Sequence, residues 1–110
     1  MSAVEVVQRQ LEAYNAQNMD AFLATYALDC QICDLNGAVT QNGREDIRAR
    51  YSAMFAQFPE NKARLVNRIS LGDVVIDHED VVRGPNGPRL EAIAIYTVKN
   101  GLIARVDFVK

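Results

Sequence analysis

The sequence contains no tryptophan, a single histidine, three prolines and only two cysteines. No apolar run approaches the ~20 residues that a membrane-spanning helix requires. The net charge is only −2, with both signs interspersed, so there is no basic surface of the kind that binds nucleic acid or anionic lipid. These absences exclude a membrane-embedded protein and a nucleic-acid-binding protein.

The two cysteines, Cys30 and Cys33, have the spacing of a redox pair, but their surroundings predict a strand. A redox pair normally lies at a helix N-terminus, where the thiol pKa is lowered. Residues three apart on a strand point to opposite faces, so we predict two structural thiols. Because the acidic residues around His78 also alternate between faces, the sequence predicts neither a metal site nor a cofactor.

Apolar residues make up 49% of the 110 residues and charged residues 24%, which is typical of a globular protein. This length fits one domain over residues 1–110. Residues 1–17 are amphipathic and charged, unlike a secretory signal. We therefore expect a cytoplasmic protein.

The first half of the chain predicts three helices. Apolar residues recur at three- and four-residue spacing over 4–14, and a second, short helix is predicted from about Asp20 to Tyr26. The third helix begins near Gly43 and ends at Pro59. Its apolar side carries Ile47, Tyr51, Met54, Phe55 and Phe58.

Strands dominate the remainder. A hairpin is predicted from 31–34 and 38–41 around the Asn36-Gly37 turn. Short connections imply that the later strands form an antiparallel meander, with the helices packed on one face. These later strands are predicted at 64–71, 74–83, 89–99 and 102–109.

Several local runs accompany this order of elements, among them Val6-Val7-Gln8-Arg9, Tyr26-Ala27-Leu28-Asp29 and the run over 43–48. Together they resemble the ketosteroid-isomerase-like, SnoaL-like members of the nuclear-transport-factor-two-like superfamily. The resemblance implies an α+β fold, a cone-shaped curved antiparallel sheet with three helices on its concave face. In such a fold the sheet and helices enclose a pocket for a small apolar molecule.

The resemblance also suggests individual roles. The catalytic base of ketosteroid isomerase falls on Asp34, and a supporting tyrosine falls on Tyr51. The oxyanion-hole residues of that enzyme fall on Gln10 and Ala94 and do not match. Tyr14, one helical turn beyond Gln10, is a substitute donor, and a classical steroid isomerase is not expected.

Alternation along strand 74–83 gives two candidate faces, and the pattern alone does not choose between them. The resemblance to the family favours the face of Ile76, His78 and Asp80 as concave, rather than the face of Asp77 and Glu79. The same register turns Tyr96, Arg105 and Asp107 inward. It turns Ile93, Ile95, Val106 and Phe108 outward, where they would form a homodimer interface.

The predicted pocket therefore combines catalytic and binding residues. Its catalytic residues are Asp34, His78 and Asp80. The substrate-binding residues are Gln10, Tyr14, Tyr51, Phe55, Ile76, Tyr96, Arg105 and Asp107.

Three functions remain open from the sequence. The first is proton transfer on a small apolar carbonyl compound by an isomerase, cyclase or dehydratase, with Asp34 as base. The second is epoxide hydrolysis, in which Arg105 and Asp107 help to activate water. The third is a noncatalytic ligand-binding or interaction domain, in which Asp34 caps the turn and the charged residues only form ion pairs.

Overall fold

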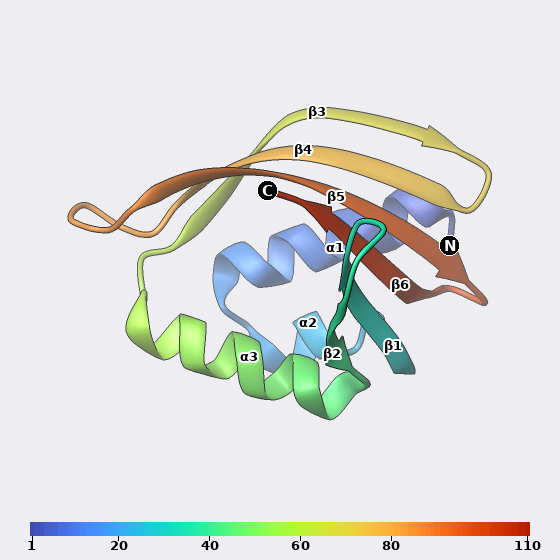
Figure 1. Cartoon of the computed structure of the whole chain (residues 1–110), viewed down its shortest axis with the longest axis horizontal. Helices are drawn as coiled ribbons and strands as arrows, with labels where there is room; N and C mark the ends of the chain where they lie inside the picture. The colour runs from blue at the N-terminus through green and yellow to red at the C-terminus, as the bar shows by residue number, and fades with distance from the viewer.

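Three helices lie against one face of a curved six-stranded sheet in the computed structural model, which covers residues 1–110 (Figure 1). The expected α+β fold is confirmed. The helices are α1 (Ala3–Ala16), α2 (Met19–Leu23) and α3 (Arg44–Gln57). The strands are β1 (Tyr26–Asp34), β2 (Val39–Asn42), β3 (Lys62–Leu71), β4 (Val74–Val82), β5 (Arg89–Lys99) and β6 (Leu102–Val109).

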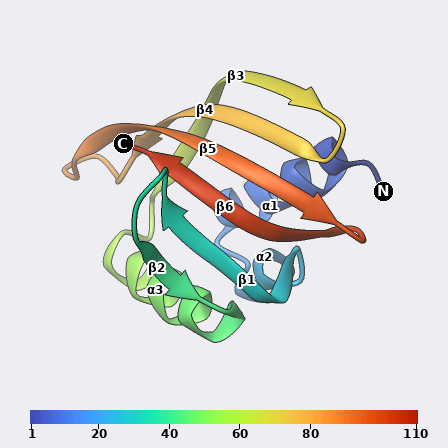
Figure 2. The ribbon, with the colours of Figure 1, turned by 45° about the vertical axis from the view of Figure 1, so that its right-hand side comes forward.

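The sheet has the strand order β2-β1-β6-β5-β4-β3. The last four strands form the expected antiparallel meander, whereas β1 pairs with β6 in parallel. This parallel pair joins the early hairpin to the end of the chain, as Figure 2 shows. The β3–β6 part curves over the helices and leaves its concave face toward them.

Local signals set the helix boundaries. Ser2 and Glu5 form a capping box at the start of α1, and the side chain of Asn18 caps α2. The second helix is shorter than expected: it ends at Leu23, and Tyr26 begins β1. Pairing of Tyr26 with Ile103 of β6 overrides the local helical pattern.

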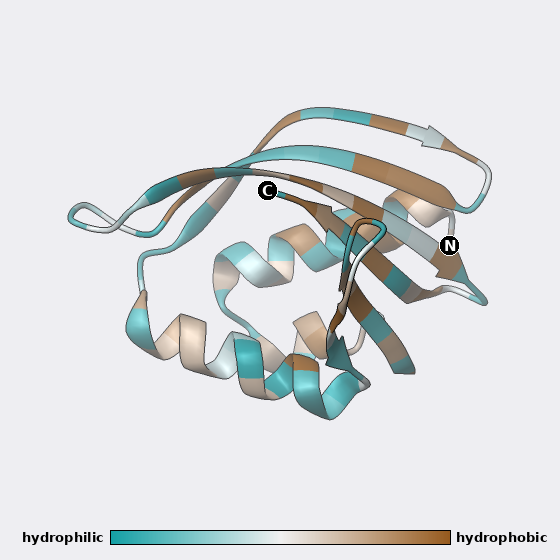
Figure 3. Cartoon of the chain, in the orientation of Figure 1, coloured by the Kyte–Doolittle hydropathy of each residue, from teal (hydrophilic) through white to brown (hydrophobic).

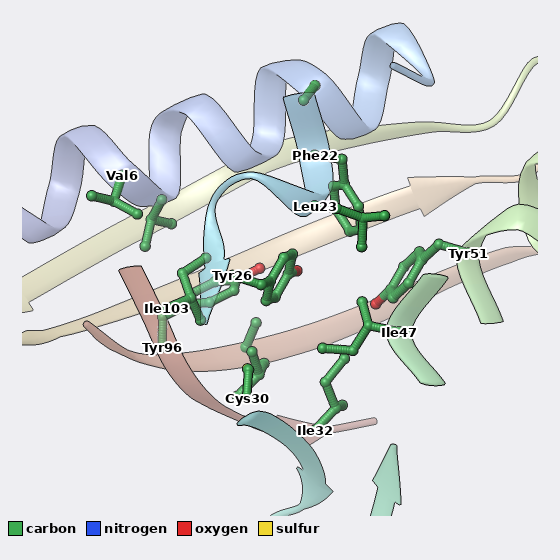
Figure 4. Close-up of a cluster of buried hydrophobic side chains, with 14 of the residues drawn as sticks. Val6, Phe22, Leu23, Tyr26, Cys30, Ile32, Ile47, Tyr51, Tyr96 and Ile103 are labelled. Carbon is green, nitrogen blue, oxygen red and sulfur yellow. The ribbon is translucent and has the colours of Figure 1, made fainter. Parts of the chain in front are cut away.

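The main core, a cluster of 17 buried residues, lies between the helices and the concave face. Phe22 from α2 stands at its centre, with its ring 5.1 Å from that of Tyr26 and 4.8 Å from that of Tyr51 (Figure 4). Aromatic pairs at such distances add to the gain from burial. They fix α2 and α3 against the sheet and so shape the space beside them.

The convex face carries an apolar row of Ile69, Ile76 and Ile95, which are paired across β3, β4 and β5. Hydrophobic colouring continues along β4 to the β3–β4 turn (Figure 3). Ile95 and Ile93 face outward as expected, and Ile93 is 36% exposed. The homodimer that this face suggests stays a prediction. None of the helices is long and apolar enough to cross a membrane.

The outward positions predicted for Val106 and Phe108 are wrong. Thr97 pairs with Arg105 but Val98 pairs with Ile103, so β6 carries one extra residue at Ala104. Such a bulge reverses the alternation beyond it. Val106 is therefore buried in the core, and Phe108 packs against it from the same side.

Candidate functional site

A cavity of about 80 Å³ lies between the concave face and helices α1 and α3. Nine of its 14 lining residues are hydrophobic, including Met54, Val81, Leu90 and Phe108. Pockets that enclose drug-sized ligands typically measure ~300–1,000 Å³. The enclosed space therefore suits a small molecule, or one end of a larger molecule that extends through the open side.

Glu79 is the only acidic side chain among the lining residues. It lies on the concave face of β4, opposite Ala92 of β5, whose small side chain leaves space beside it. Glu79 is only 7% exposed, and its carboxylate forms no hydrogen bond or ion pair within the protein. Burial, reinforced by the nearby Asp77 carboxylate, raises the pKa of Glu79 to about 7, although Arg68 opposes the shift.

Asp77 occupies the neighbouring inward position but has a different role. Its two carboxylate oxygens accept hydrogen bonds of 2.7 and 3.0 Å from Arg68, whose third nitrogen donates to Gln8 at 2.8 Å. Both charges are thus compensated in place, as a buried ion pair requires. Asp77 thus holds Arg68, which joins α1 to the sheet, and Asp77 does not line the cavity.

Two tyrosine hydroxyls share the cavity with Glu79. Tyr51 and Tyr96 line the cavity and have no hydrogen-bond partner within the protein. Burial raises the pKa of Tyr51 to about 12 and that of Tyr96 well above its ordinary value, and the Glu79 charge reinforces both shifts. Both hydroxyls therefore stay protonated and can donate a hydrogen bond to a ligand.

Gln10 and Tyr14 complete the polar lining. The Gln10 amide donates to the Tyr26 hydroxyl at 3.0 Å, and the Tyr14 hydroxyl accepts from the Asn61 amide at 2.7 Å. Tyr14 keeps its own proton available, since it acts as an acceptor in that bond. Four residues predicted from sequence thus line one cavity, namely Gln10, Tyr14, Tyr51 and Tyr96. Phe55, also predicted, packs behind Tyr14 with ring centres 5.7 Å apart and does not line it.

The inward face predicted for β4 is wrong. The hairpin pairs Val82 with Arg89, so Asp77 rather than His78 lies opposite the inward-facing Ala94. Ile76, His78 and Asp80 consequently lie on the convex face.

Surface ion pairs account for the polar members of that face. The His78 ring nitrogen is 3.4 Å from the Glu91 carboxylate, and Asp80 is held by Arg64 and Arg89. Neither His78 nor Asp80 reaches the cavity.

The bulge in β6 likewise corrects the predicted positions of Arg105 and Asp107. Both lie on the convex side, where the Arg105 guanidinium is 3.0 Å from the Asp107 carboxylate. The epoxide-hydrolysis hypothesis placed this pair in the pocket, and the pair does not line the cavity.

Asp34 lies at the exposed end of β1, outside the cavity lining. Its backbone N–H donates to Ala38, and its carbonyl accepts from Gly37, so it begins the hairpin turn. Asp34 pairs with Phe108 across β1 and β6 and so shares the concave side, but beyond the buried region. The expected placement of this carboxylate inside the pocket is wrong.

Sequence reasoning missed four charged lining residues: Glu79, Arg50, Arg83 and Lys110. The signal for Glu79 was present, because it belonged to the alternative face of β4. Arg50 lies within the predicted third helix, Arg83 ends the predicted strand 74–83 and Lys110 follows the last predicted strand. Only the folded chain brings these three together.

A second, more open groove of about 550 Å³ runs along α1 and α2. Small apolar residues dominate its wall, including Ala13, Ala16 and Ala21, and its charged residues are Arg9 and Glu12. It contains no buried ionisable group, so the enclosed cavity at Glu79 is the better candidate for chemistry.

The comparisons with known proteins agree with this architecture. The SnoaL-like domain family matches residues 7–106. No curated protein matches the chain in sequence. An uncharacterized protein with a cystatin fold from Novosphingobium aromaticivorans is 29% identical, with a TM-score of 0.92 over 100% of this chain and 99% of the other.

Two further solved structures share the fold at lower identity. A proposed polyketide cyclase from Sinorhizobium meliloti is 24% identical, with a TM-score of 0.80 over 96% of this chain and 94% of the other. A proposed ketosteroid isomerase from Kribbella flavida is 17% identical, with a TM-score of 0.80 over 96% of this chain and 75% of the other.

Proposed function

Because this chain belongs to the SnoaL-like domain family, we propose that it is an enzyme that transfers a proton within a small carbonyl compound, in an isomerisation or a cyclisation. One observation carries the proposal. The Glu79 carboxyl is buried, faces the cavity, has no partner within the protein and has a pKa of about 7. The names of the polyketide-cyclase and ketosteroid-isomerase neighbours are consistent with such chemistry.

A carboxyl with a pKa near 7 suits a reversible proton carrier, since both of its forms are populated at neutral pH. Ionised Glu79 accepts a proton from a carbon next to the carbonyl, and the C–H electrons form an enolate. In an isomerisation the Glu79 acid returns that proton to a different carbon. In a cyclisation the enolate carbon attacks a second carbonyl of the same molecule, and the proton passes to the alkoxide oxygen that forms.

The Tyr51 and Tyr96 hydroxyls provide the second requirement, stabilisation of the enolate oxygen. They are neutral donors on the same cavity as Glu79, in surroundings from which most water is excluded. Donors held in such surroundings stabilise developing charge strongly. This pair would replace the oxyanion hole that Gln10 and Ala94 do not supply.

The noncatalytic alternative has less support. A vestigial pocket would have polar groups that satisfy one another, whereas Glu79, Tyr51 and Tyr96 are left without protein partners. Their polar atoms open onto the cavity and are free to contact a ligand, as expected of a functional site.

The test begins with a screen of small enones, lactones and epoxides for turnover. Glu79→Gln keeps the shape of the side chain and removes the proton acceptor, so kcat should fall ~10²-fold or more. The wild-type rate should rise with pH to a half-maximum near 7, as Glu79 ionises. Tyr51→Phe and Tyr96→Phe should each lower kcat with the fold intact.

Two matched controls isolate the role of Glu79. Glu91→Gln changes an exposed glutamate on the neighbouring strand and should leave the rate unchanged. Asp34→Asn tests the base that the resemblance suggested. Loss of turnover in Asp34→Asn together with full activity in Glu79→Gln would reverse the assignment.

A further inference from the structure

Three cations line the outer part of the cavity: Arg50 of α3, Arg83 after β4 and Lys110 after β6. None of them forms an ion pair, although Arg64, Arg68, Arg89 and Arg105 all pair with aspartates elsewhere. A protein with 14 acidic and 12 basic side chains has enough carboxylates to pair with such a group. The three cations and the single acidic side chain of the lining, Glu79, therefore leave an excess of positive charge at this cavity.

Neutral groups hold the two arginines in place. The Arg83 guanidinium donates to the side-chain oxygen of buried Asn61 at 3.0 Å and lies 5.5 Å from the ring centre of Phe58. Arg50 donates to the Gln41 side-chain oxygen at 2.8 Å and lies over the Tyr51 ring at 5.0 Å. Neutral acceptors and rings orient a guanidinium without cancelling its charge.

The three charges also act on one another. Burial lowers the pKa of Lys110, and the charges of Arg50 and Arg83 lower it further, whereas Asp34 opposes the shift. Like charges gathered at the edge of an apolar cavity repel each other, and a bound anion removes that repulsion. The buried part of the wall, with Tyr96, Val81 and Ala92, is largely apolar apart from Glu79, Gln10 and the tyrosine hydroxyls.

We infer that the substrate is a small organic acid, bound with its carboxylate between Arg50, Arg83 and Lys110 and its apolar, reacting part next to Glu79. This inference rests on the proposed function for the role of Glu79, but the charge at the entrance is an independent observation. Arginine forks match the planar carboxylate group, and anchoring one end of a small molecule orients the other end for reaction.

The experiment compares benzoate with benzamide, a neutral molecule of nearly the same shape, by calorimetric titration at pH 6 and low salt. At this pH most Glu79 is protonated, because its pKa is about 7, and does not repel the anion. Benzoate should bind about ten-fold or more tightly, the range expected for a charge-assisted contact, and added salt should remove the preference.

Variants identify the cations. Arg83→Gln and Lys110→Gln should each weaken benzoate binding several-fold and leave benzamide binding unchanged. Arg89→Gln is the matched control, since Arg89 pairs with Asp80 on the convex face outside the cavity. Equal binding of the two probes, no binding of either, or loss of binding in Arg89→Gln alone would each overturn the inference.

The same titration with Glu79→Gln separates this inference from the proposed function. Preference for benzoate should persist in this variant, because the binding cations are intact. If Glu79→Gln retains full turnover while benzoate is still preferred, the proton-transfer proposal fails and the organic-acid inference stands. If Glu79→Gln abolishes turnover but benzamide binds as well as benzoate, the organic-acid inference fails and the proton-transfer proposal stands.

Discussion

Glu79→Gln should make the protein more stable at pH 8 and leave its stability nearly unchanged at pH 5. Burial holds the pKa of Glu79 at about 7, above its ordinary value of 4.5. Between these values the folded state binds more protons than the unfolded state, so stability falls as the pH rises through this window. Above pH 7 the wild-type protein retains a buried charge that glutamine lacks.

The size of the effect follows from the two pKa values. Their difference, about 7 minus 4.5, is about 2.5, and each pH unit corresponds to about 1.4 kcal/mol. The buried charge therefore costs about 3 kcal/mol at pH 8, an upper value because glutamine is also polar and buried. For a domain of this size that corresponds to a rise in Tm on the order of 10 °C.

Thermal unfolding followed by circular dichroism at pH 5, 6, 7 and 8 measures this difference. The Tm of Glu79→Gln relative to wild type should increase steadily across the series. Glu91→Gln removes a glutamate whose side chain is 73% exposed and should show no such trend.

A difference in Tm that is the same at pH 5 and pH 8 would refute the reasoning, because it would mean that Glu79 ionises alike in the folded and unfolded states. The raised pKa of about 7 would then be disproved, and the proposal of Glu79 as a proton carrier would lose its main support. A combined result of greater stability at pH 8 and lost turnover would instead indicate a carboxylate kept for its chemistry.

Three further predictions concern the scaffold. Phe22→Ala removes the centre of the aromatic cluster and should lower the free energy of unfolding by ~3–5 kcal/mol in urea denaturation. Arg68→Met leaves the buried Asp77 charge unpaired and should cost ~3–5 kcal/mol, most of which Arg68→Met with Asp77→Leu should restore. The wild-type protein should be a dimer through its convex face by light scattering, and Ile76→Glu should be a folded monomer; a wild-type monomer at tens of micromolar would contradict this.

Much of the fold could be predicted because local signals agree with tertiary structure along most of the chain. Turn residues such as Asn36-Gly37 and Asn100-Gly101 mark hairpins that the structure contains, and Gly101 has the positive φ of 77° that favours glycine. The apolar side of the third helix also faces the core as expected, through Ile47, Tyr51 and Phe55. Tyr26 is the main exception, because its strand pairing depends on the distant β6.

The candidate site was predicted only in part, because its residues depend on which way each strand faces. The family resemblance placed the helical residues Gln10, Tyr14 and Tyr51 in the pocket, and all three line the cavity. Strand positions alternate with a period of two, so an offset of one residue exchanges the inward and outward sets completely. His78 on β4 therefore points outward instead of inward as predicted. The bulge at Ala104 has the same effect on Arg105 of β6.

Alternation alone does not show which face of β4 points inward, because both faces carry acidic residues. The residues paired with them on β5 distinguish the two faces. In the observed register Asp80 lies opposite Glu91, and Arg64 and Arg89 compensate the charge of Asp80 on the convex face. Glu79, in contrast, lies opposite Ala92, which provides neither a countercharge nor a hydrogen bond. Packing alone would favour an apolar residue at that position, because an unpaired buried carboxyl lowers stability. A carboxylate that faces an alanine across a sheet and opens onto a cavity is therefore better explained by proton transfer than by folding.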